Sequence, residues 1–78
     1  MKVKLIWKFY GQDSLKTANH HLIHLKDFAE EKNIILFGNG VETNKLNLSE
    51  AYIIVLKENV DSLREILKPH KGVLLNNQ

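Results

Sequence analysis

The chain has 78 residues, 44% of them hydrophobic, with no cysteine and a formal net charge of +2. This length allows one domain, residues 1–78, and without cysteine the chain can form neither disulfides nor thiolate zinc sites. No segment approaches the ~18 apolar residues of a membrane-spanning helix, and lysines interrupt the N-terminal apolar residues that a signal peptide would need. We therefore expect a soluble, cytoplasmic protein that contacts no membrane.

Residues 2–10 alternate between two sets of side chains, which is typical of a β-strand with one face against a core. The expected core set is Val3, Leu5, Trp7 and Phe9. The expected outer set is Lys2, Lys4, Ile6, Lys8 and Tyr10. Because no acidic residue occurs among the three lysines, the sequence predicts a mildly basic edge or face here.

Residues 11–14 break this strand, and a helical periodicity follows. Asp13 or Ser14 is expected to cap the helix by accepting hydrogen bonds from free backbone N–H groups of its first turn. Apolar residues then recur at alternating spacings of three and four, which predicts an amphipathic helix that ends near residues 32–33. Its expected buried stripe is Leu15, Ala18, Leu22, Leu25 and Ala29.

Two further strands are predicted between residues 34 and 56. Residues 34–37 form a short apolar run, which predicts a strand that is interrupted by a turn or bulge at residues 38–40 (Gly-Asn-Gly) and resumes at 41–43. Residues 44–50 predict a polar turn. Residues 52–56 are apolar on both faces, as a central strand tends to be, and the sequence leaves open which face is inward.

The last part of the chain predicts a short helix and a short strand. Asn59 is the expected cap of the helix, and Pro69 ends it because a residue before proline is disfavoured in the α conformation. Residues 68–71 are interpreted as a basic, exposed helix end. Gly72 then turns the chain into a strand at 73–75. The expected buried stripe of the helix is Val60, Leu63, Ile66 and Leu67.

The element order β-α-β-β-α-β predicts an α+β domain with a ferredoxin-like split βαβ arrangement. Its antiparallel four-stranded sheet has the order 4-1-3-2, with both helices on one face. The other face then exposes Ile6, Tyr10 and one apolar set of residues 52–56. Contiguous apolar surface usually marks an interface, so a sheet-to-sheet homodimer is the preferred interpretation. The alternatives are a small patch tolerated in water, and single-stranded nucleic acid stacked on Tyr10 beside Lys4 and Lys8.

The first predicted helix carries three histidines within five residues, His20, His21 and His24. His20 and His24 are about one helical turn apart, a spacing that lets two imidazoles bind one Zn²⁺ or Cu²⁺ ion together with a carboxylate. The carboxylates expected on the same side are Asp13, Asp27 and Glu31. Histidines on a solvated helix face are also ordinary, and two at this spacing arise by chance. His21 falls at the boundary of the apolar stripe, close to Thr17 and Phe28, where burial would shift its pKa.

Three segments together resemble the dimeric α/β-barrel superfamily and, within it, the YciI-type proteins. They are the helix segment 21–28, the strand end 37–40 and the strand 51–55. The resemblance implies that such domains pair sheet to sheet and that a helix histidine lies near a ligand cavity. On this basis His21 or His24 is a candidate acid–base group of an enzyme.

The sequence therefore favours a small homo-oligomeric binding or regulatory module with an unknown ligand and no cofactor. Three alternatives stay open. The first is acid–base catalysis by His21 or His24, and the second is a divalent metal at His20 and His24. The third is single-stranded nucleic acid on the sheet, with Lys8 and Tyr10 as the ligand-binding candidates.

Overall fold

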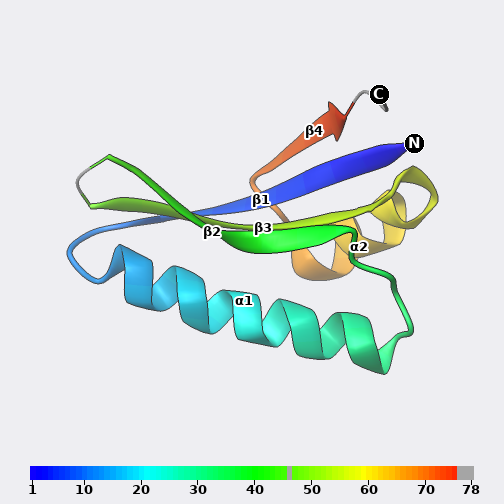
Figure 1. Cartoon of the computed structure of the whole chain (residues 1–78), viewed down its shortest axis with the longest axis horizontal. Helices are drawn as coiled ribbons and strands as arrows, with labels where there is room; N and C mark the ends of the chain where they lie inside the picture. Colours follow the sequence, from blue (N-terminus) through cyan, green and yellow to red (C-terminus); the bar gives the residue numbers. More distant parts are fainter. Residues whose placement is uncertain (46, 76–78) are drawn as a thin grey trace.

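The chain folds as β-α-β-β-α-β, the order of elements that the sequence predicts (Figure 1). The structure is a computed structural model, and it describes residues 1–45 and 47–75. No helix in these two ranges is long and apolar enough to span a bilayer. The strands are β1 (Lys2–Tyr10), β2 (Gly38–Lys45), β3 (Leu48–Leu56) and β4 (Lys71–Leu75). The helical segments are α1 (Ser14–Glu31), a 3₁₀ turn (Lys57–Asn59) and α2 (Val60–Leu67).

The four strands form one antiparallel sheet in the order β2-β3-β1-β4, which reads 4-1-3-2 from the opposite edge. β1 and β3 are the central strands and pair without interruption from Lys2 opposite Leu56 to Tyr10 opposite Leu48. β4 pairs with β1 and β2 pairs with β3, so these two strands form the edges. The chain is thus an α+β domain built on one twisted sheet.

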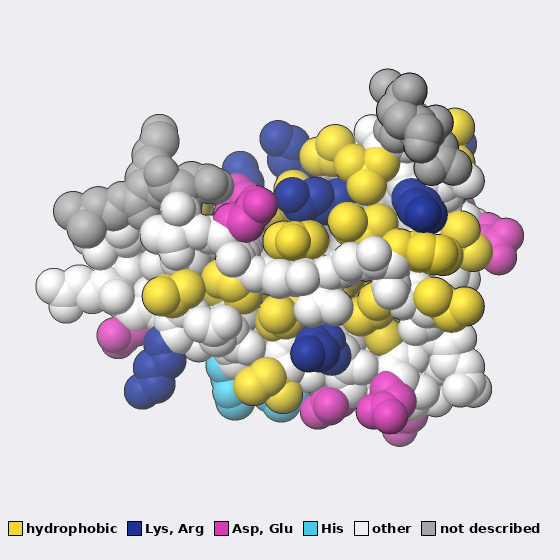
Figure 2. Space-filling view, viewed as in Figure 1, with side chains coloured by type: hydrophobic (Ala, Val, Ile, Leu, Met, Phe, Trp, Pro, Cys, Tyr) yellow, Lys and Arg dark blue, Asp and Glu magenta, His cyan; other side chains and the backbone are white. Residues whose placement is uncertain are grey.

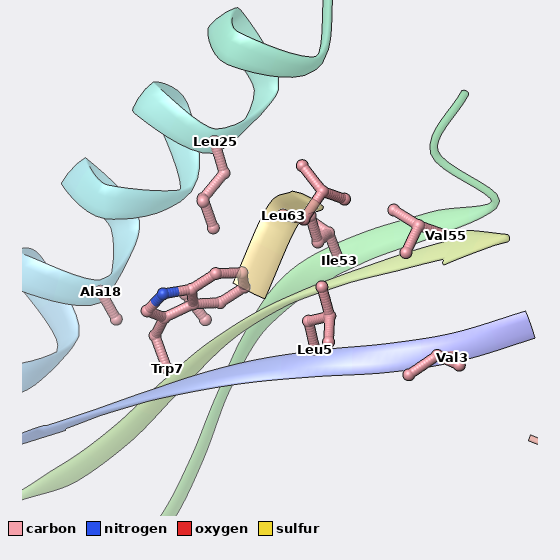
Figure 3. Packing of buried hydrophobic residues seen from close by; sticks show 9 residues of the cluster. Val3, Leu5, Trp7, Ala18, Leu25, Ile53, Val55 and Leu63 are labelled. Carbon is pink, nitrogen blue, oxygen red and sulfur yellow. The ribbon is translucent and has the colours of Figure 1, made fainter. Parts of the chain in front are cut away.

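Both helices pack against the same face of this sheet, and Figure 3 shows their side chains meeting those of β1 and β3. Leu25 of α1 and Leu63 of α2 lie in the same buried cluster. The odd-numbered residues of β3 face inward, so the structure defines which of its two apolar faces belongs to the core. The cluster consists of Val3, Leu5, Trp7, Ala18, Leu25, Ala51, Ile53, Val55 and Leu63. We call the other face of the sheet, which carries the even-numbered residues of β1 and β3, the open face.

Most residues of the predicted helix stripes face the core, but one residue of each stripe does not. In the first turn of α1 Ser14 is buried, whereas Leu15 is 50% exposed. A hydrogen bond of 3.0 Å between the Ser14 and Ser49 hydroxyls holds this turn against β3, which rotates Leu15 outward. In α2 the side of Leu63 faces the core, and Ile66 is 58% exposed. Side-chain pairing across the layers, rather than apolar spacing alone, therefore fixes the rotation of α1.

The predicted side-chain caps are also wrong. Asp13 and Asn59 occupy the N-cap positions of α1 and α2, but neither side chain makes a capping hydrogen bond. Their φ and ψ angles are −96° and 18° for Asp13, and −93° and −5° for Asn59. A capping side chain usually requires an extended backbone at this position, which neither residue has.

The second strand begins at Gly38, so the strand predicted at 34–37 is wrong. Asn33 has a φ of 59°, in the left-handed region, and this turn ends the helix. The Ile34 N–H then donates to Ala29 O at 2.8 Å, which keeps the start of the apolar run tied to α1. The run therefore serves as the connection from helix to sheet.

Gly38 and Gly40 lie inside β2, which corrects the turn or bulge predicted there. Side chains of β3 explain why both positions are glycine. A Cβ atom at Gly40 would come within 2.9 Å of the Tyr52 hydroxyl, and one at Gly38 within 2.9 Å of Ile54 Cδ1. The two glycines leave a strip of β2 without side chains, over which Tyr52 and Ile54 lie on the open face.

Two other strand boundaries differ from the predictions. The turn predicted at 44–50 is wrong because β2 continues to Lys45 and β3 already begins at Leu48; residue 46 lies outside the described residues. Asn47, with a φ of 65°, adopts the left-handed conformation that a tight reversal requires. Gly72 lies within β4, because this strand begins at Lys71 and not after the glycine.

Candidate functional site

Histidines from two distant parts of the chain lie close together on the helix side of the molecule. His20, His21 and His24 belong to α1, and His70 directly precedes β4. Each of His24, His70 and His20, when it carries a positive charge, lowers the pKa of His21. Figure 2 shows histidine side chains gathered along the edge of the molecule where α1 runs. We call these four residues the histidine cluster.

His21 is the innermost member of the histidine cluster. Its ring packs against Trp7 and Phe9 of β1, with centroid distances of 5.4 and 5.3 Å. The Nε2 atom is buried and has no hydrogen-bond partner among the described residues. Burial lowers the pKa of His21 below its ordinary value, and the nearby positive charges of His24, His70 and His20 lower the pKa further. The position at the core boundary is as predicted, but its aromatic neighbours come from β1.

His20 and His24 form a second part of the histidine cluster, on the exposed side of α1. Their Nε2 atoms are 3.0 Å apart, and their rings meet edge to face at a centroid distance of 4.6 Å. Two nitrogens that bind one ion at about 2.1 Å and at right angles lie about 3.0 Å apart. No third histidine or carboxylate completes a ligand group within residues 1–45 and 47–75. The pair has the spacing of two adjacent ligands, and the metal site stays a prediction.

His70 is the residue of the cluster that sequence reasoning missed. Its Nδ1 accepts a hydrogen bond of 2.7 Å from the Lys8 N–H, and its own N–H donates to Ile6 O at 2.9 Å. The side chain thus extends the pairing of β1 beyond the first residue of β4. Because this contact joins residues 62 positions apart, no local pattern in the sequence could reveal it.

The two ligand-binding candidates on the sheet, Lys8 and Tyr10, both lie on the open face. Lys8 is half-buried opposite Glu50, and Tyr10 is 73% exposed opposite Leu48. The described structure brings neither of them into contact with the histidine rings through its side chain. His24 lines a shallow depression with Asp27, Phe28, Glu30 and Glu31. Acid–base catalysis by His21 or His24 stays a prediction.

Lysines and apolar side chains alternate on the open face. Lys4 Nζ is 3.6 Å from Glu42 Oε1 and 4.3 Å from the ring centroid of Tyr52. Lys2 Nζ lies 4.4 Å above the ring of Phe37. Figure 2 shows Lys and Arg side chains set among hydrophobic ones in the region of the strands. The lysine stems therefore cover part of the apolar surface while their ammonium groups stay near water.

In comparisons with known proteins, no family model, no curated protein and no solved structure matched this chain.

The lowered pKa of His21 predicts a pH-dependent stability. Between the ordinary histidine pKa of about 6.5 and the lower value in the folded state, the unfolded chain binds more protons than the folded chain. The free energy of unfolding should be fully retained above this window and should fall as the pH drops through it. Urea titrations across pH 5–8 measure this slope.

The matched variant is His21→Leu, which removes the titrating ring and keeps an apolar contact with Trp7 and Phe9. Its slope in this pH window should be shallower than that of the parent by a fraction of one proton. An equal slope in both proteins would show that His21 titrates alike in the folded and unfolded states.

The spacing of His20 and His24 predicts binding of Cu²⁺ in preference to Zn²⁺, because Cu²⁺ favours ligands at right angles and stands higher in the affinity order of divalent metals. Calorimetric titration at pH 7.5 should give affinities for Cu²⁺ that fall roughly tenfold or more in His20→Ala and in His24→Ala. His21→Leu is the control, because its Nε2 is buried. Equal losses in all three variants would contradict a site at this pair.

Proposed function

We propose that this chain is a ferredoxin-like binding module that works as a homodimer and pairs through its open face. The fold assignment is supported by the β-α-β-β-α-β order, the antiparallel sheet with β1 and β3 in its centre, and the two helices on one face. The pairing is supported by the side chains of the open face. A domain of this size gains stability from burying a second face that it cannot cover by itself.

The observation that carries the proposal is the apolar surface that extends across three strands of the open face. Ile6 is 7% exposed, and the neighbouring apolar residues are half-buried. Phe37, directly before β2, is 44% exposed and extends the surface at one edge. The half-buried residues are Tyr52, Ile54, Leu56, Val73 and Leu75. Continuous apolar surface on one face is typical of an interface.

The strand register suggests how two copies fit. A two-fold axis that runs along the strands, between β1 and β3, places β1 of one copy over β3 of the other. Lys8 then faces Glu50 of the second copy, because the two residues occupy the same row of the sheet. In the same arrangement Val73 lies in the row of Gly38, where the Ile54 side chain of the other copy covers the sheet. Opposite charges and apolar side chains therefore meet across the proposed interface.

Charge reversal tests this arrangement directly. Lys8→Glu and Glu50→Lys each place like charges in the same row and should shift the chain toward monomer in sedimentation velocity at micromolar concentration. A mixture of the two variants should form a heterodimer, because each mixed pair again joins a lysine to a glutamate. Circular dichroism of each variant confirms that the monomer stays folded.

The apolar contact has its own matched pair of variants. Ile54→Lys places a charge in the open face and should abolish dimerisation, whereas Ile23→Lys places the same charge on α1, where the residue is already 57% exposed, and should not. A parent chain that sediments as a monomer near 9.0 kDa, or two reversed variants that fail to associate on mixing, would overturn the proposal.

Single-stranded nucleic acid is the second candidate partner, favoured by the charge of the open face. Four lysines project there against two glutamates among the described side chains, and two of these lysines lie over aromatic rings. The lysines are Lys2, Lys4, Lys8 and Lys71, and the glutamates are Glu42 and Glu50. Lysines beside aromatic rings are the means by which proteins bind single strands.

Fluorescence anisotropy with a labelled oligothymidine tests this second function. If four phosphates are contacted, the affinity should fall roughly fiftyfold between 50 and 200 mM salt, and Lys4→Gln should reduce the salt dependence. An affinity that does not change with salt would contradict it.

A further inference from the structure

A groove opens between α2 and β4 on the helix side of the sheet. Leu74 and Gly72 lie on the same side of the sheet as Val3 and Leu5, because they are their register partners. Val3 and Leu5 are buried, but Leu74 is 53% exposed and Gly72 is exposed as well. Helix α2 therefore covers β1 and leaves the inner side of β4 open.

This α2–β4 groove has a volume of about 320 Å³. Small-molecule sites in proteins typically begin at about 300 Å³. The lining residues are Val3, Leu5, Val60, Arg64, Pro69, His70, Lys71, Gly72 and Leu74. The aliphatic floor that the groove exposes consists of Val60 of α2 and Leu74 of β4, because Val3 and Leu5 lie beneath and are only 7% and 0% exposed. The groove lies on the opposite side of the sheet from the open face, so it is independent of the proposed dimer interface.

The rim of the groove is basic and carries no acidic residue. Arg64 of α2 makes no ion pair within the part of the chain that the structure describes. Lys71 also lines the groove, although its register places its side chain toward the open face. Arg64 is therefore the cation that lines the groove from the helix side, and a guanidinium binds a carboxylate through two parallel hydrogen bonds.

His70 adds a second hydrogen-bond donor with a defined orientation. Its Nδ1 accepts from the Lys8 N–H at 2.7 Å. In the neutral ring the proton must then be on Nε2, which makes Nε2 a donor. The backbone N–H of His70 is held by Ile6 O, so the residue is fixed at both ends. A neutral His70 can thus donate to an anion without first taking up a proton.

We propose that the α2–β4 groove binds a small monocarboxylate with a short apolar chain. Arg64 and the Nε2–H of His70 hold the carboxylate, and the chain lies on the aliphatic floor between α2 and β4. The complementarity is one of charge and polarity together, because a basic rim without acidic residues adjoins an aliphatic floor in which Leu74 is 53% exposed.

Gly72 provides a substitution that fills the groove with little cost to the fold. A Cβ at this position would lie 3.6 Å from Leu5 Cδ2 and 3.8 Å from Val3 Cγ1, which are ordinary contacts. The φ angle of Gly72 is not positive, so an L-residue fits the strand. Gly72→Val should therefore keep or raise stability, because valine favours strands, and should close the floor of the groove.

The experiment is a titration of the ¹⁵N-labelled chain with octanoate, followed by amide chemical shifts. We expect the largest changes in amide chemical shift at β4, at His70 and along the side of α2 that carries Arg64. Octanoate should bind roughly tenfold or more tightly than 1-octanol or acetate, since each of these lacks one half of the complementarity. Gly72→Val and Arg64→Gln should each weaken octanoate binding by a similar factor, and Lys26→Gln, which removes a lysine of α1 outside the groove, should not.

Three results would overturn the proposal. One is octanoate shifts that are absent or centred on the open face. Another is equal affinity for octanoate and 1-octanol, which would leave only an apolar contact. The third is a folded Gly72→Val chain that binds octanoate as the parent does. None of them bears on the dimer, whose test measures sedimentation and charge pairing on the other face.

Discussion

Three consecutive residues of β1 bind the segment that joins α2 to β4, and the helix side of the molecule depends on this junction. Ile6 O accepts from the His70 N–H, Trp7 Nε1–H donates to Leu67 O at 2.9 Å, and the Lys8 N–H donates to His70 Nδ1. Trp7 is also 3% exposed and part of the buried cluster. One strand thereby fixes the end of α2, the reversal that follows it and the starting point of β4.

The junction explains why the groove and the histidine cluster lie where they do. Lys68 adopts a left-handed conformation with φ 50° and ψ 60°, which ends α2 after eight residues. A helix this short covers β1 and leaves the inner side of β4 uncovered. On the other side of Trp7, the same indole that binds Leu67 O packs against the His21 ring. Trp7 thus contacts both the end of α2 and the half-buried imidazole of His21.

The sequence predicts most of the fold because its strongest signals are periodic. The alternation of residues 2–10 gives β1 its correct bounds and its core face, and the element order follows from the two helical stripes. The failures occur where a distant contact overrides a local pattern. Ser14 is buried because Ser49 offers it a hydrogen bond, and the glycines of β2 belong to a strand because Tyr52 and Ile54 cover them.

Some features of the candidate sites follow from local sequence spacing, and others form only in the folded chain. The proximity of His20 and His24 follows from helical spacing, and their Nε2 atoms do converge to 3.0 Å. His70 could not be placed from the sequence, because its contact with Lys8 forms only when α2 has brought the chain back to β1. The groove could not be predicted from the sequence either, because its lining residues come from β1, α2, β4 and the segment before β4, which only the fold brings together.

The two faces of β1 differ in composition: the core face is hydrophobic throughout, whereas the open face combines lysines with Ile6 and Tyr10. On the core face every odd-numbered position from Val3 to Phe9 is hydrophobic, which is enough to define an inside. On the open face the lysines flank Ile6, whose side chain is nearly as buried as the core residues although no helix covers it. That burial comes from neighbouring side chains on the sheet, including Tyr52 directly opposite. The lysine stems and Tyr52 already shield the centre of this face within one chain, so a partner would gain most at its less covered margins. Lys8 and Glu50, which are register partners toward one end of the central strands, therefore bear on the proposed pairing together with the apolar side chains at these margins.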